Sequence, residues 1–260
     1  MSELDELLQI AKMVVTDAGK IALNPGFALD IDTKTSRNDL VTQVDKRIEA
    51  QIAAQLEKVT RMPLLGEENH QVDSFNGRVW VLDPIDGTMN YVTTKRDYAI
   101  SLALCEDGIP VLGVVLDVTK GALYSAITGQ GAFRDGTPLT QVDAKASFTD
   151  TILITDLKEI LALPRLANAL VRSRGHRRYG SAALEMIEVA LGQAGAFIHL
   201  WVSPWDIAAA SLICAEAGVI CTRLDGTYLD VCAKGSVLAA WPKVHQELHY
   251  LLIQKAFDVD

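Results

Sequence analysis

The segment VWVLDPID, residues 79–86, places a short apolar run directly before two aspartates. Four apolar residues rich in β-forming side chains predict a buried strand over residues 79–82, and the Asp83-Pro84 pair is expected to end it. A buried strand delivers the residues at its carboxyl end to the crevice where ligands bind in open α/β sheets. The segment therefore predicts a sheet that carries two carboxylates at one edge.

Other apolar runs and periodic patterns fill most of the chain. Further strands are predicted over residues 98–104, 111–118, 122–127, 151–155, 196–200 and 236–240. Helices are predicted from Ser2 onward, from near Thr42, and over residues 165–173, 181–193, 204–217 and 242–256. Strands in the middle with helices toward both ends favour a layered fold over strict βαβ alternation, in a single domain spanning residues 1–260.

Composition limits the classes of partner. The sequence holds 33 acidic and 24 basic residues, a net charge of -9, which opposes binding to nucleic acid or an anionic membrane. The N-terminal segment carries acids where a signal peptide would be basic, and the four cysteines are scattered, so we expect a cytoplasmic protein with reduced thiols. An acidic protein can still bind phosphate when a cation lies between its carboxylates and the ligand.

Two acidic motifs are candidates for holding such a cation. Asp83 and Asp86 would repel each other unless neutralised, and the intervening Ile85 carbonyl would add an oxygen of the kind that Mg²⁺ prefers. Glu67 and Glu68, in LLGEEN, follow a short apolar stretch and a glycine. Taken singly, the first motif also fits a turn, and the second fits an exposed acidic loop equally well.

Two further motifs have both a structural and a chemical interpretation. In DGT, Gly87 and Thr88 would point backbone N–H groups outward and let a phosphate oxygen approach closely. In SPWD, Ser203 and Pro204 suit the start of a helix, and Asp206 fits its first turn. Asp206 can stabilise that helix N-terminus, complete a metal site, or do both.

Together these motifs resemble the signatures of the inositol monophosphatase family. The likeness rests on GEEN (66–69), WVLDPIDGTMNY (80–91) and WD (205–206), and extends to Lys34, to DLVT with Asp45, to GAF (131–133) and to GSAA (180–183). The resemblance implies an α+β fold, an α-β-α-β-α layered sandwich of the inositol monophosphatase and fructose-1,6-bisphosphatase type. It also implies a homodimer, two or three Mg²⁺ ions per site and inhibition by lithium.

The resemblance implies a role for each matched residue. One Mg²⁺ would be held by Glu67, Asp83 and the Ile85 carbonyl, a second by Asp83, Asp86 and Asp206, and a third, weaker ion would lean on Glu67. Thr88, within reach of Asp45, would orient or deprotonate the attacking water, with Glu67 as the third catalytic residue. The remaining implied roles are substrate contacts by Asp86, Gly87, Thr88, Ser181, Ala182, His199 and Asp206, and support of the ligands by Glu68 and Lys34.

One departure from the family pattern bears on the substrate. Relatives that favour inositol phosphates place a glutamate seven residues before the final aspartate, and this chain has His199 there. We expect hydrolysis of a small phosphate ester, inositol 1-phosphate first, with fructose 1,6-bisphosphate, NADP and 3′-phosphoadenosine 5′-phosphate as alternatives. Arg177 and Arg178 would reach a second phosphate or lie on the surface. A glycosidase using two of the carboxylates, and a non-catalytic interaction protein on this scaffold, are the competing hypotheses.

Overall fold

The computed structural model describes residues 2–26, 31–33 and 40–254. The helices are α1 (Glu3–Leu23), α2 (Gln43–Thr60), α3 (Thr88–Thr93), α4 (Leu157–Ala162), α5 (Arg165–Arg172), α6 (Ala182–Ala190), α7 (Pro204–Glu216) and α8 (Pro242–Leu252), with a 3-10 turn at Phe148–Asp150. The strands are β1 (Ile31–Thr33), β2 (Leu40–Thr42), β3 (Leu64–Gly66), β4 (Arg78–Asp86), β5 (Ala99–Glu106), β6 (Ile109–Asp117), β7 (Ala122–Ile127), β8 (Ala132–Arg134), β9 (Thr137–Pro138), β10 (Ile152–Ile154), β11 (Gly175–Arg177), β12 (Ala196–Val202), β13 (Ile220–Thr222) and β14 (Gly235–Ala240).

Two mixed sheets form the framework. The larger has the order β3-β4-β5-β6-β7-β8-β9, with β3 parallel to β4 and every later neighbour antiparallel. The smaller has the order β11-β10-β12-β14-β13, and β10 runs parallel to both of its neighbours. β1 and β2 pair as a separate antiparallel ribbon.

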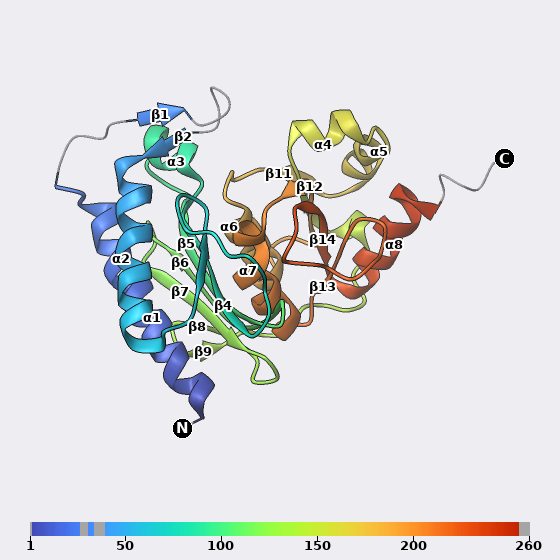
Figure 1. The fold of residues 1–260 in the computed structure, drawn as a ribbon. Helices are drawn as coiled ribbons and strands as arrows, with labels where there is room; N and C mark the ends of the chain where they lie inside the picture. The colour runs from blue at the N-terminus through green and yellow to red at the C-terminus, as the bar shows by residue number, and fades with distance from the viewer. Residues whose placement is uncertain (1, 27–30, 34–39, 255–260) are drawn as a thin grey trace.

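The helices lie in three layers around these sheets (Figure 1). α1 and α2 cover the outer face of the seven-stranded sheet, α6 and α7 lie between the sheets, and α4, α5 and α8 lie beyond the smaller sheet. α7 is buried over most of its length, and an added Cβ at Gly113 of β6 would lie 2.7 Å from the Ala209 carbonyl oxygen. This close packing confirms the predicted α-β-α-β-α layers.

Some predicted ends of strands and helices differ from the structure. The strand predicted over residues 79–82 continues to Asp86, because its register shifts between Asp83 and Asp86 and so takes Pro84, which has no N–H, out of the hydrogen-bonded ladder. The last helix was predicted to reach residue 256 but ends at Leu252. Its start at Pro242 was predicted correctly.

The structure describes the state of the cysteines and the length of the helices. All four cysteines are free thiols; Cys105 and Cys214 are buried, and Cys221 and Cys232 are half-buried. None of the described helices is both long enough and apolar enough to cross a bilayer.

Candidate active site

The end of β4 carries two buried aspartates. Asp83 is opposite Ser101 of β5 and Asp86 is opposite Ala99, so the irregular segment between them lets both side chains remain at the strand end. Only 2% of Asp83 and 7% of Asp86 is exposed. An Asp83 carboxylate oxygen accepts a hydrogen bond from the Ile85 N–H at 3.0 Å, which fixes the turn of the backbone.

Two more carboxylates join them from other elements. Glu67 follows β3, which pairs in parallel with β4 so that Gly66 is level with Leu82. Asp206 lies in the first turn of α7, where its carboxylate accepts the Ser203 N–H at 2.7 Å. The Ser101 hydroxyl donates to the Trp205 carbonyl at 3.4 Å and so ties the start of α7 to the strand opposite Asp83.

The four carboxylates interact strongly. Burial raises the pKa of Asp83 well above its usual value, and the charges of Glu67, Asp86 and Asp206 raise it further. Burial, with the Asp86 charge, raises the pKa of Asp206 to about 8. Burial also raises the pKa of Asp86 to about 6, although hydrogen bonds from Ser181 and two amides act against it. The protein holds this charge at an energetic cost unless a cation neutralises it.

This donor set fits a hard divalent cation. Carboxylate and carbonyl oxygens are the ligands that Mg²⁺ prefers, and the ion usually keeps several waters. Within the described ranges, no three His, Cys, Asp or Glu side chains already form a closed cage. An ion that is bound through one or two carboxylates and water does not need such a cage.

Asp86 is held by the start of α6. Its two oxygens accept the Ser181 hydroxyl at 2.5 Å, the Ala182 N–H at 3.1 Å and the Ala183 N–H at 2.7 Å. Ser181 is also the N-cap of this helix, whose N-terminal dipole favours a negative charge. The polar groups of Ser181 and Ala182, predicted to contact substrate, are thus bonded to Asp86 itself.

The structure brings Thr88 and Asp45 together. The Thr88 hydroxyl oxygen lies 3.2 Å from an Asp45 carboxylate oxygen and 3.1 Å from the Ile85 carbonyl oxygen. One hydroxyl proton can be donated to only one of these acceptors at a time. Asp45 is fully buried on α2, and its carboxylate lies within reach of Thr88, as the resemblance implied.

Gly87 connects β4 to α3 in a left-handed conformation, with φ of 93°. An added Cβ would lie 3.2 Å from the carbonyl oxygens of both Asp97 and Gly180. Asn90 holds this packing, because its amide donates to the Asp97 carbonyl at 2.8 Å and to the Tyr179 carbonyl at 2.6 Å. Only glycine can adopt this backbone conformation without strain.

We therefore expect Gly87→Ala to destabilise the protein. The left-handed conformation costs a non-glycine residue about 1–3 kcal/mol. The two carbonyl oxygens lie so close to the added methyl group that the backbone cannot shift to reduce this strain. Urea unfolding of wild type and variant measures the loss. Gly121→Ala is the matched control, since Gly121 has φ of 64° but nothing within 4 Å of an added Cβ; a loss no larger than in this control would show that the carbonyl contacts are unimportant.

The predicted substrate residues at the rim have protein partners. The His199 Nδ1 atom accepts the Trp201 N–H at 3.1 Å and lies 3.4 Å from a carboxylate oxygen of the buried Glu159. Burial lowers the pKa of His199. Arg178 pairs with Asp156 at 2.7 Å, and Arg177 is exposed, with a guanidinium bond to the His176 carbonyl. Lys34 lies outside the described residues.

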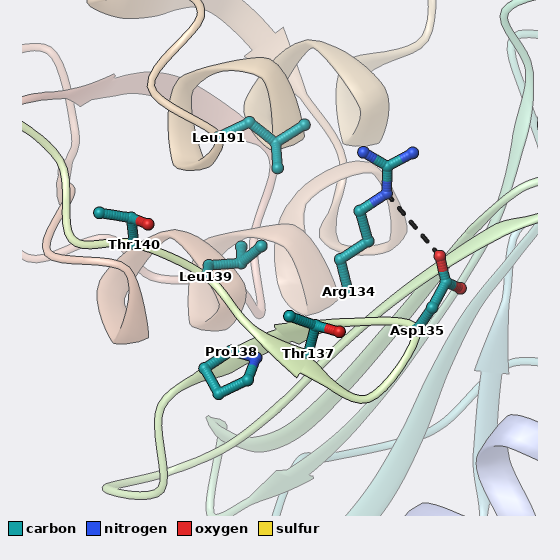
Figure 2. Close-up of a pocket in the computed structure, with 7 residues that line it drawn as sticks. All are labelled: Arg134, Asp135, Thr137, Pro138, Leu139, Thr140 and Leu191. Carbon is teal, nitrogen blue, oxygen red and sulfur yellow. Dashed lines mark ion pairs between the residues drawn. The ribbon is translucent and has the colours of Figure 1, made fainter.

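A separate surface hollow of about 470 Å³ lies at the β8–β9 end of the larger sheet (Figure 2). Its lining contains none of the four carboxylates. The cation in it, Arg134, lies 3.7 Å from the neighbouring Asp135, as the dashed line marks. Asp135 is the one carboxylate in this lining, so the hollow has no acidic cluster of the kind found at the end of β4.

Sequence reasoning missed a buried acid beside the loop that carries Glu67. Glu49 lies on α2 four residues after Asp45, and its carboxylate bonds to the backbone that follows Glu67. The spacing of four, which places both acids on one face of a helix, was the available signal.

Comparisons with known proteins give the family of this chain. The sequence model of the inositol monophosphatase family matches residues 3–257. The chain is 35% identical to inositol-1-monophosphatase of Bacillus subtilis, covering 95% of this chain and 97% of that one. It is 32% identical to Nus factor SuhB of Escherichia coli K12, covering 92% of each. A solved IMPase/NADP phosphatase complexed with Mg²⁺ and phosphate superposes with a TM-score of 0.87 at 30% identity, covering 95% of this chain and 96% of that one.

The layered fold, with carboxylates on β4 and α7, matches that of a solved phosphatase. The chain belongs to the inositol monophosphatase family.

Proposed function

We propose that this chain is a Mg²⁺-dependent phosphomonoesterase that hydrolyses a small phosphate ester, inositol 1-phosphate first. The observation that carries the proposal is the convergence of Glu67, Asp83, Asp86 and Asp206. Burial, together with the charges of neighbouring carboxylates, raises the pKa values of the three aspartates. Such a cluster is costly without cations and becomes a strong electrophilic site with them. Lithium inhibition is part of the same proposal.

The proposed ligand sets are those that the family resemblance implies. Glu67, Asp83 and the Ile85 carbonyl would hold one ion, and Asp83, Asp86 and Asp206 a second, with Glu67 supporting a third. Ions bound there supply positive charge that stabilises the attacking and leaving oxygens of an in-line displacement at phosphorus.

The chain's own residues would position the water and the ester. When the Thr88 hydroxyl donates to Asp45, its oxygen lone pairs are left to accept a hydrogen bond from the attacking water. The half-buried Glu67 carboxylate can accept the water's other proton. The amides of Gly87 and Thr88 would bind phosphate oxygens, because a glycine lets an anion approach the backbone closely.

The experiment that tests the reaction is phosphate release by the purified protein with Mg²⁺ and with a chelator. The substrates are inositol 1-phosphate, fructose 1,6-bisphosphate, NADP and 3′-phosphoadenosine 5′-phosphate. We expect release that disappears with chelator and returns with added Mg²⁺, and that falls in LiCl but not in an equal concentration of KCl. Release that resists the chelator would refute the mechanism, and hydrolysis of a glycoside in its place would favour the carboxylate pair of a glycosidase.

The substrate preference is open to a direct comparison. His199 stands where inositol-selective relatives have a glutamate, and one similar structure is that of an IMPase/NADP phosphatase. We expect His199→Glu to raise activity on inositol 1-phosphate relative to NADP in paired kcat/KM measurements. An unchanged ratio would show that this position does not select the substrate.

A second candidate function is a non-catalytic role in an assembly. It is favoured by the 32% identity to a Nus factor over 92% of this chain. Such a role would survive loss of the metal carboxylates. A cellular phenotype that a null strain shows and that an Asp86→Asn strain does not would favour this role over hydrolysis.

A further inference from the structure

Glu49 is a buried acid outside the proposed ligand set. It is fully buried on α2, one helical turn after Asp45. Asp45 contacts Thr88, and Glu49 on the same face contacts the chain that follows β3. One face of α2 therefore reaches both halves of the site.

The Glu49 carboxylate holds three consecutive backbone amides. One oxygen accepts the Glu68 N–H at 2.7 Å, and the other accepts the N–H groups of Asn69 at 2.6 Å and His70 at 3.0 Å. The His70 Nδ1 atom lies 2.7 Å from the second oxygen. Charged acceptors make hydrogen bonds about twice as strong as neutral ones, so this carboxylate fixes the loop closely.

The loop is closed on its other side as well. The Gly66 N–H donates to the His70 carbonyl at 2.9 Å, and an added Cβ at Gly66 would lie only 2.4 Å from a Glu49 carboxylate oxygen. Glu67 lies between these two fixed points. Its carboxyl group is within hydrogen-bonding reach of Asp83.

We propose that Glu49 is a positioning residue for the metal site: by holding the amides of residues 68–70, it aims the Glu67 carboxylate at Asp83. The inference rests on the proposed metal-dependent function. Mutation of a residue that orients a metal ligand commonly changes metal affinity by about 10–100-fold. Mutation of a residue that only stabilises the loop would change the stability of the fold and leave the affinity unchanged.

The test is Mg²⁺ binding by calorimetry to the full chain, well below the melting temperature of each variant. In Glu49→Gln, one carboxylate oxygen becomes an NH₂ group that faces backbone N–H donors, so the loop loses part of its anchor. We expect the Mg²⁺ dissociation constant to rise about tenfold or more and the circular dichroism spectrum to stay unchanged.

Glu216→Gln is the matched control. Glu216 ends α7, about 15 Å along the helix from Asp206, and its carboxylate accepts the Gly129 and Gly131 N–H groups at 2.7 Å each. This clamp has the same chemistry at a distance from the site. We expect the control to lose melting temperature and to keep its Mg²⁺ dissociation constant within about twofold of wild type, the range of a surface change.

A second variant reaches the same carboxylate from the opposite side. Gly66→Ala would displace the Glu49 side chain, so it should weaken Mg²⁺ binding similarly, and the double variant should be little worse than either single one. If Glu49→Gln and Gly66→Ala lower the melting temperature but leave Mg²⁺ affinity at the wild-type value, the inference is overturned. If wild type itself binds no Mg²⁺, the proposed function fails first and the inference with it.

Discussion

Asp83→Asn is expected to lower turnover by about a thousandfold or more and to raise the melting temperature of the metal-free protein. Asp83 lies among the charges of Glu67, Asp86 and Asp206, so removing its charge removes repulsion as well as a ligand. Asparagine keeps the oxygen that accepts the Ile85 N–H at 3.0 Å. Turnover at saturating Mg²⁺ and thermal melting in chelator measure the two effects.

Asp117→Asn is the control for this experiment. Asp117 is equally buried, at the end of β6, but it pairs with Lys120 at 2.9 Å and accepts the Thr119 hydroxyl, and its loss should destabilise the fold. The two variants should therefore shift the melting temperature in opposite directions, and only Asp83→Asn should abolish turnover. An Asp83→Asn protein whose melting temperature in chelator falls below that of wild type would contradict the proposed role. So would one that keeps wild-type turnover.

The layered architecture followed from sequence wherever an element was long and periodic. The strand predicted over residues 122–127 matches β7 at both ends, and the helix predicted from Pro204 matches α7 to within one residue. The Ser2 capping box at the start of α1 is present, with bonds in both directions to Asp5. In these places local propensity, capping and burial all favour the same structure.

Several short elements were not predicted, because they are stabilised by partners distant in sequence. β3, β11 and β13 have three residues each, too few to show a period, and each forms only beside a neighbouring strand. α4 has six residues, and the buried residue within it is a charged one, Glu159. A pattern of apolar residues cannot indicate such a helix.

The acidic residues of the site were predictable, and their supports were not. Residues such as Asp83 and Asp86 are adjacent in sequence to strong turn and strand signals. The bonds that hold Asp86 come from Ser181 and its neighbours, almost a hundred residues away, and those around Glu67 come from Glu49. Such long-range hydrogen bonds depend on the packed fold, so a motif states which groups are present and not what orients them.

The metal-free protein is expected to lose stability as pH rises from 5 to 9. The expected loss in the free energy of unfolding is on the order of 3 kcal/mol, a figure reduced because solvent screens the half-buried Asp206. The folded-state pKa values of Asp86 and Asp206, about 6 and about 8, are above the ordinary 3.8. A folded-state pKa raised above the unfolded value gives stability that is complete below the unfolded pKa. That stability is lost as pH rises through the folded pKa.

Bound Mg²⁺ should reverse this dependence, because the cation favours the ionised carboxylates that repel each other without it. Urea unfolding at several pH values, with chelator and with Mg²⁺, measures both curves, and their separation should grow with pH. In Asp206→Asn with chelator, the loss of stability between pH 7 and 9 should shrink, since the group that titrates there is gone. Parallel curves with and without Mg²⁺ would mean that the ion does not bind to these carboxylates, and the proposed site would be wrong.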